Sequence, residues 1–128
     1  MAELKIITKD ELKLILIEHE KWLKGIGKEG KRADLRNTDL RSVDLSGVNL
    51  YRARLADADL SGADLTKTVL READLKGADL TNTILTGTNL VNADMSYTDL
   101  RGADLRGANV TGADAKGSDT RGTSLISG

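Results

Sequence analysis

The hydrophobic residues of this chain recur every five positions over most of its length. From Ala33 to Ser127 the sequence divides into nineteen five-residue units without an insertion. The third place of the unit is Leu in fifteen of the nineteen, and the first place is small or β-branched, most often Ala. Because these two places recur together, we expect both to face a common interior.

The polar residues follow the same period. The second place is Asp or Asn in fifteen units, and the fifth place is Gly in nine. A period of five fits neither a helix nor a strand, so the chain must turn once in every unit. Gly readily adopts positive φ, and Asp and Asn accept hydrogen bonds from nearby turn amides. The pattern predicts a polygonal solenoid whose coils stack at the strand spacing of about 4.8 Å and bury the leucines in ladders.

These A(D/N)LXX units resemble the pentapeptide repeat family of bacterial proteins. The resemblance covers 95 of the 128 residues. It implies an all-β solenoid, a right-handed quadrilateral β-helix with four units per coil, so that residues 33–127 form about 4.75 coils and a rod about 23 Å long. The family often places Phe at the central position, and this chain contains none. We therefore expect a narrow, aliphatic interior.

Residues 1–32 lack the five-residue period and form a separate leader. Thr8 and Glu11 have the spacing of a capping box, and Gly25 is a typical helix end, which together predict a helix from residue 9 to residue 24. A solenoid needs a cap over its open first coil. We expect this helix to be the cap, with Trp22 as its plug and a flexible basic, Gly-rich linker after it. One helical stripe would face the coil: Leu12, Ile15, Leu16, His19, Trp22 and Leu23.

The composition narrows the functional classes. The chain has three aromatic residues and no Cys, which excludes disulfides and thiolate metal sites. No apolar run is long enough to span a membrane, and the N-terminus lacks the pattern of a signal peptide. We expect a cytoplasmic protein that has no membrane partner.

Candidate chemistry is sparse along the chain. A single His removes zinc clusters built from several histidines. The segment from Gly25 to Arg32 is close to the phosphate loop GxxxxGK[ST], but Arg32 stands where the metal-binding hydroxyl belongs, so we interpret the segment as a linker. Twelve Asp at the second place lack the spacing of a calcium loop and are interpreted as turn residues. The sequence predicts a protein that is not an enzyme, with no catalytic residue, no cofactor and no metal site.

The outer positions differ between the four expected faces. One face, formed by the units at 48–52, 68–72, 88–92 and 108–112, contains no Asp and has a net charge of +1. We call it the Leu50 face. Exposed apolar side chains beside Tyr and Arg are typical of protein contacts. This face is therefore our candidate contact surface for an unidentified protein partner, a second subunit or the chain's own leader, and neutral variation on a solvated wall is the alternative. The candidate contact residues are Tyr51, Val69, Arg71 and Val91.

A second functional hypothesis comes from the family resemblance. Some pentapeptide repeat proteins resemble duplex DNA in width and acidity, bind topoisomerases such as gyrase and protect them from quinolones. Such mimicry needs a dense negative field, whereas the net charge here is −1. The sequence therefore favours a structural or protein-interaction module over a gyrase-binding DNA mimic. Direct nucleic-acid binding is also disfavoured, because no expected face is strongly basic.

The central position changes toward the C-terminus. Leu is replaced by Val110, Ala115 and Thr120 before Leu125 restores it. Either the last coil frays, or two molecules close their ends against each other in a weak homodimer, a mode known in the family.

Overall fold

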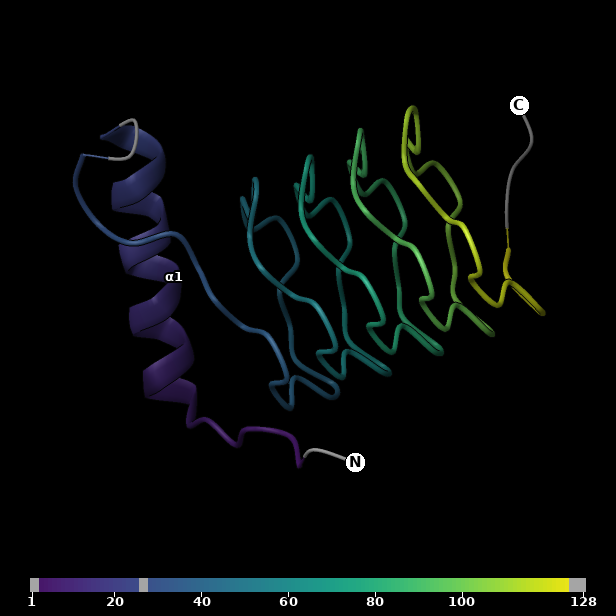
Figure 1. Cartoon of the computed structure of the whole chain (residues 1–128), viewed down its shortest axis with the longest axis horizontal. Coiled ribbons are helices and arrows are strands. Elements are labelled where there is room, and N and C mark those ends of the chain that lie inside the picture. The colour runs from purple at the N-terminus through teal and green to yellow at the C-terminus, as the bar shows by residue number, and fades with distance from the viewer. Residues whose placement is uncertain (1–2, 26–27, 125–128) are drawn as a thin grey trace.

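The computed structural model describes residues 3–25 and 28–124. Figure 1 shows a rod of stacked coils with one helix, α1 (Lys9–Lys24), lying across its N-terminal end and the C-terminal segment at the opposite end. The expected position of Leu125 inside the last coil lies outside the described residues. Apart from α1, the described residues contain single-residue bridges and turns rather than extended strands.

The coils are joined by parallel backbone bridges. Fifteen bridges connect residues that are 20 positions apart, from Asp34 with Arg54 to Asp104 with Ser124. A spacing of 20 residues is four five-residue units, which confirms the expected number of units per coil. Residues 20 apart therefore lie above one another in columns that run along the rod.

The unit at residues 58–62 shows how the backbone amides are used. Its first amide donates to the Leu55 carbonyl, closing a turn at 3.1 Å, and its second donates to Thr38 in the coil before at 3.0 Å. The third and fifth amides donate to Asp79 and Thr81 in the coil after, at 2.8 and 2.9 Å. Four of the five amides thus have backbone partners, and the fourth amide requires a side chain.

The corners depend on the fifth place of the unit. All eighteen fifth-place residues from 37 to 122 have positive φ, between 53° and 72°. Nine of them are Gly and nine are not, including Lys67 and Tyr97. A residue with a Cβ atom is strained in this region, so the corner geometry is imposed by the stacked coils where the local sequence does not favour it.

The interior is built from the third and first places, as predicted. Every third-place side chain from Leu35 through Leu105 is at most 6% exposed, including Met95. Thr replaces Ala at several buried first places, and each buried hydroxyl has an acceptor: Thr68 and Thr88, for example, each donate at 2.7 Å to the carbonyl of a Leu in the preceding coil. Within residues 3–25 and 28–124, the buried Thr side chains therefore leave no unpaired hydroxyl in the core.

The leader forms the predicted cap helix. The amide of Glu11 donates to Thr8 Oγ1 at 3.0 Å, and the amide of Thr8 donates to Glu11 Oε1 at 3.1 Å, which completes the capping box. Helix α1 begins and ends at the predicted residues, with Gly25 as its C-cap. Before the helix, Lys5 pairs with the first coil through a parallel bridge to Thr38.

The predicted plug of the cap is wrong in one respect. His19, not Trp22, is the buried residue of α1, with 1% of its surface exposed. Trp22 is half-buried and stacks on His19, with ring centroids 5.4 Å apart. Leu12, Ile15 and Leu16 are partly buried and pack against the leucine core. A smaller polar ring fits against the coil because its ring nitrogen has a partner there.

Residues 28–32 of the expected linker are in contact with α1. The amide of Lys31 donates to the Glu18 carbonyl at 3.0 Å, which ties this segment to α1. Gly30 has φ of 72°, and a Cβ atom there would overlap the Glu18 carbonyl oxygen and the Trp22 amide. Gly30 is therefore required for the close approach of the two backbones.

The C-terminal coil keeps its backbone ladder through Ser124, which exchanges hydrogen bonds of 2.8 and 2.9 Å with the coil before it. Its central side chains are no longer covered, and Val110 is 44% exposed. The backbone ladder thus extends as far as Ser124, while the end of the core is open.

Replacing Lys67 with Gly tests the strain at the corners. We expect Lys67→Gly to raise the free energy of unfolding by about 0.5–1 kcal/mol, because relief of left-handed strain exceeds the added entropy of the unfolded chain. Lys116→Gly is the matched control at a fourth place, where φ is not positive, and it should lower stability. Chemical denaturation of both variants measures the difference, and equal effects would contradict this account.

Candidate functional site

The Asp and Asn residues of the second place act as turn acceptors. In all fifteen units that carry Asp or Asn there, the side-chain Oδ1 accepts the amide of the residue two positions later. The distances lie between 3.0 and 3.3 Å. This supplies the partner of the fourth amide and confirms the interpretation of these residues as turn residues. Among the described residues, no group of three or more His, Cys, Asp or Glu could hold a metal ion.

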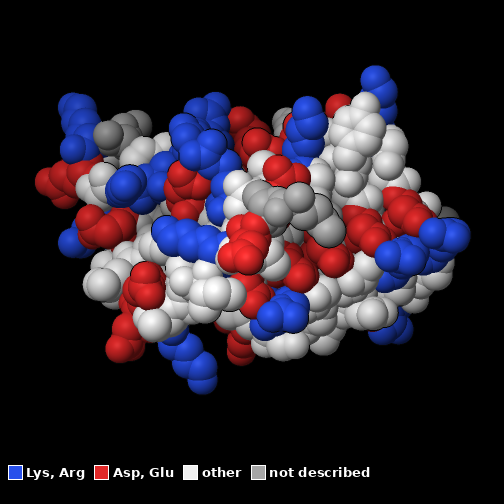
Figure 2. Space-filling model, turned by 60° about the horizontal axis from the view of Figure 1, so that its bottom comes forward, with Lys and Arg blue, Asp and Glu red and all other residues white. Residues whose placement is uncertain are grey.

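Charges of both signs are mixed on the surface. On the face shown in Figure 2, basic and acidic side chains are interspersed rather than gathered into one broad region of a single sign. Many of them are ion pairs within one unit, in which Arg at the fourth place folds back onto Asp at the second. Arg106 and Asp104 form such a pair at 2.6 Å.

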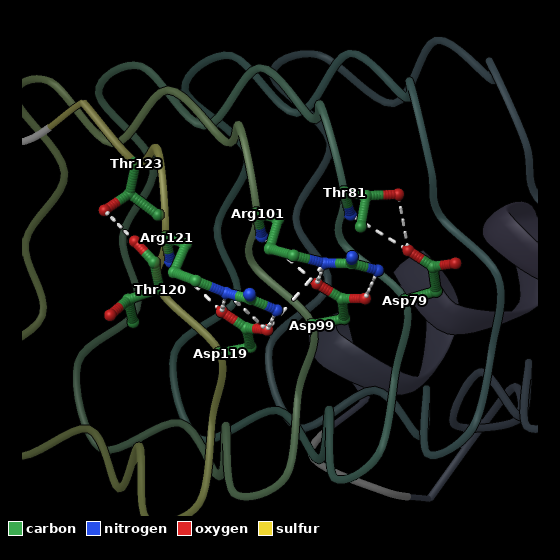
Figure 3. Close-up of polar contacts among 8 residues, drawn as sticks. All are labelled: Asp79, Thr81, Asp99, Arg101, Asp119, Thr120, Arg121 and Thr123. Carbon is green, nitrogen blue, oxygen red and sulfur yellow. Dashed lines mark hydrogen bonds and ion pairs between the residues drawn. The ribbon is translucent and has the colours of Figure 1, made fainter.

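One column consists of five stacked Asp residues, Asp39, Asp59, Asp79, Asp99 and Asp119, joined by successive backbone bridges. Figure 3 shows its C-terminal part, where Arg101 lies against Asp99 and Arg121 against Asp119. Arg41 occupies the same place in the first coil, so three of the five Asp carry an Arg partner.

The arginine partners lower the pKa of three Asp carboxyls in this column. Side-chain hydrogen bonds from Arg41 and Arg121 lower the pKa of Asp39 and Asp119 from 3.8 to about 2. A hydrogen bond from Arg101 lowers the pKa of Asp99 in the same way. These partners offset part of the repulsion between the five stacked carboxylates, at Asp39, Asp99 and Asp119.

The Leu50 face brings the four predicted contact residues together. Val69 lies between Asn49 and Asn89 in one column, while Tyr51, Arg71 and Val91 occupy the fourth places of three successive coils. The two valines and the tyrosine are half-buried, and the Arg71 side chain is 53% exposed. The arrangement is consistent with a contact surface, which stays a prediction.

Tyr51 is held in place by charged neighbours. Its hydroxyl donates to Glu72 Oε2 at 3.3 Å, and the Arg52 guanidinium lies 5.5 Å from its ring centroid. Arg52 also donates to Glu72 Oε1 at 3.1 Å. The ring is therefore fixed at the corner between two coils, which lowers the entropy lost when a partner binds it.

Some apolar side chains elsewhere on the surface are more exposed than Tyr51, Val69 and Val91. Ile84 is 42% and Tyr97 54% exposed on other sides of the rod, and Leu14 is 62% exposed on α1. For Ile84 the sequence carries a signal, since it breaks the Asp/Asn rule of the second place. Tyr97 has none, because its ring position over Gly117 depends on a residue 20 positions away.

A groove of about 940 Å³ separates α1 from the first coil. Its apolar walls are formed by Leu12, Leu16 and Ile17 of the helix and by Val43 and Val48 of the coil. Lys9 and Lys13 lie at its rim. The helix thus covers the open end of the core incompletely on this side.

His19 joins the cap to the solenoid. Its Nδ1 accepts the amide of Ala33, the first residue of the repeats, at 2.9 Å, whereas its Nε2 is buried and has no hydrogen-bond partner among the described residues. Burial is the main cause that lowers the pKa of His19; the Arg32 charge also lowers it, and the Tyr51 backbone opposes the shift. His19 is therefore a neutral structural residue of the cap.

The family model for pentapeptide repeats matches this chain in eight copies, over residues 31–57, 49–87 and 83–122. These matches cover more than half of the chain. The chain belongs to the pentapeptide repeat family. Family membership implies the right-handed quadrilateral β-helix that the repeats predicted, and the 20-residue bridges fit its four-sided coil. Comparison with curated protein sequences finds no match.

Solved structures of other pentapeptide repeat proteins are similar to this one. A protein from the Arabidopsis thaliana thylakoid lumen is 31% identical, with a TM-score of 0.70 over 79% of this chain and 73% of that chain. Rfr23 from the cyanobacterium Cyanothece 51142 is 38% identical, with a TM-score of 0.49 over 77% and 68% of the two chains. HetL from Nostoc, a protein involved in heterocyst differentiation regulation, is 26% identical, with a TM-score of 0.45 over 75% and 73%. No helix among the described residues is long and apolar enough to cross a membrane.

The buried His19 predicts a pH-dependent stability of this pentapeptide repeat protein. The unfolded chain titrates His19 near pH 6.5, but the folded pKa is lower, so below pH 6.5 the unfolded state binds more protons. The stability that neutral, buried His19 provides is fully present above pH 6.5. It is lost as the pH falls from 6.5 toward the pKa of His19 in the folded protein. We expect the free energy of unfolding to decrease between pH 7 and pH 5, as measured by urea denaturation.

His19→Gln is the control for this measurement, because Gln can still accept the Ala33 amide but does not titrate. His19 is the only His in the chain, and the carboxylates titrate at lower pH. The variant should therefore lose the slope between pH 7 and pH 5. A variant with the same slope as the natural protein would show that His19 is not its source.

Proposed function

We propose that this pentapeptide repeat protein is a non-enzymatic protein-interaction module that binds its partner, another protein or a second copy, through the Leu50 face. One observation carries the proposal. The repeat geometry aligns Tyr51, Val69, Arg71 and Val91 on the one face whose second-place column contains no Asp. A partner that covers this face need not desolvate a column of carboxylates.

The rigidity of the fold supports this role. Backbone bridges fix the spacing between coils, and Tyr51 is additionally held by Glu72 and Arg52. A preformed surface with an immobilised Tyr binds a partner with little loss of side-chain entropy. Tyr and Arg are also the residue types that most often dominate the binding energy of interfaces.

The gyrase-binding alternative has less support from the charges. Three of the five residues in the most acidic column, Asp39, Asp99 and Asp119, are paired with Arg, which reduces the negative field that imitation of a phosphate backbone needs. We also propose the right-handed coil of the family and a cytoplasmic location. The open C-terminal coil, where Val110 is exposed, is the proposed site of a weak homodimer.

Changing Tyr51 and Val91 together to Ser tests the contact face. We expect the double variant to weaken association with a partner or with itself by about tenfold or more, because truncation of a central interface Tyr commonly costs 1–2 kcal/mol. Light scattering over a concentration series measures self-association. Capture on immobilised protein, followed by mass spectrometry, measures partner binding.

The matched control changes Tyr97 and Ile84 to Ser, which removes one aromatic and one aliphatic side chain from other faces. This variant should bind like the natural protein. Equal behaviour of both double variants in both assays would overturn the assignment of the Leu50 face. A gyrase supercoiling assay tests the alternative separately, and inhibition or quinolone protection there would favour DNA mimicry.

A further inference from the structure

A pocket of about 350 Å³ lies at the corner where the Leu50 face meets the next face of the rod. It is formed by the end of the leader and by the first coils, so residues that are distant in sequence meet there. Four arginines and two carboxylates line it: Arg32, Arg36, Arg52, Arg54, Glu72 and Asp74.

Two of the four arginines are already paired. Arg36 donates from Nε and Nη2 to the two oxygens of Asp34, at 2.8 and 2.7 Å. Arg52 donates to Glu72 Oε1 at 3.2 and 3.1 Å. The Glu72 carboxylate is further occupied by the Tyr51 hydroxyl at 3.3 Å. The carboxylates of Asp34 and Glu72 are therefore already neutralised by Arg36 and Arg52.

Arg32 and Arg54 have no ion-pair partner within 4.0 Å among the described residues, which include every Asp and Glu of the chain. Arg54 lies in the column between Asp34 and Asp74, yet neither carboxylate reaches its guanidinium. The pKa of Arg32 is lowered, mainly by burial and next by the charges of Arg54 and Arg52. Asp74 is the remaining carboxylate of the lining, so the four arginines of the pocket leave an excess of positive charge.

Arg54 is also an exception to the Asp/Asn pattern of the second place. Fifteen second-place residues are Asp or Asn and accept the amide two positions later, whereas Arg54 cannot accept one. The amide of Ala56 consequently has no side-chain acceptor among the described residues. A cation at this place weakens the turn and contributes only its charge and its position in the pocket.

We propose that this pocket binds the phosphate group of a small phosphorylated metabolite, with Arg32 and Arg54 as its principal ligands. The guanidinium group matches the geometry of phosphate oxygens and forms paired, charge-assisted hydrogen bonds to them. Arg36 and Arg52 are oriented by their carboxylate partners and provide further N–H donors at the walls.

The surroundings favour a small ligand over a polymer. Asp34, Glu72 and Asp74 limit the positive region to a single pocket, which is too short for a nucleic-acid backbone that needs a continuous basic track. A second hollow of about 530 Å³ lies beside the first and shares Arg32 and Arg36 with it. It provides space for the part of the metabolite that carries the phosphate.

The test is the titration of the full chain with inorganic phosphate, pyrophosphate and glycerol 3-phosphate, measured by calorimetry at low ionic strength. We expect saturable binding of one ligand per chain. Arg54→Asn should weaken it by about tenfold or more, since one paired hydrogen-bond set from Arg is lost. Asn restores the turn acceptor of the repeat, so this variant should fold at least as stably as the natural protein.

Arg106→Asn is the matched control, because it removes one positive charge from another face. Tenfold weakening in Arg54→Asn and in Arg32→Gln, with less than twofold change in Arg106→Asn, would support the pocket. Absence of saturable binding, or equal weakening in all three variants, would overturn it. Vesicles that contain phosphatidic acid separate the two sources of phosphate: binding to vesicles without binding to glycerol 3-phosphate would overturn the small-metabolite assignment.

Discussion

Each five-residue unit must turn the backbone once and supply partners for its amides, and the rest of the structure depends on this constraint. Three amides of a unit bond to neighbouring coils, one closes the turn, and the fourth-place amide is left for a side chain. Asp or Asn at the second place fills that position. The apolar ladder follows, because a coil that satisfies its amides in this way directs the third-place side chains inward.

The regular part of the fold could be predicted from the sequence because it depends on residues close together in the chain. The turn acceptors, the Leu ladders and the limits of α1 at Lys9 and Lys24 are all local features. The strained corners were less apparent: half of the fifth-place residues are not Gly, and their positive φ is imposed by the stacking of coils. Local preference and the global repeat disagree at these corners, and the repeat prevails.

The cap and the surfaces were harder to predict, because they depend on contacts between distant residues. Size and apolarity favour Trp22 as the plug. In the structure, the buried residue is His19, because its ring accepts the amide of Ala33. A helical wheel of residues 9–24 cannot show this contact, because Ala33 lies outside the helix. The sequence predicts a linker around Gly30, and the structure places Gly30 where two backbones meet. Predicting the pocket between Arg32 and Arg54 likewise requires both the number of units per coil and the path of the leader.

Departures from the repeat mark second-place positions whose side chain does not serve as the turn acceptor. Before Ser124, the described part of the repeat replaces Asp or Asn at three second places, Arg54, Val69 and Ile84, and each leaves a fourth-place amide without a side-chain acceptor. Arg54 lines the arginine pocket, Val69 lies on the candidate contact face, and Ile84 is an exposed apolar residue. At each of these three positions the residue present removes a hydrogen bond of the turn, so it does not stabilise the turn. Because the same geometry recurs in every unit, an exception to the second-place rule is a sharper criterion for choosing candidate binding residues than exposure alone.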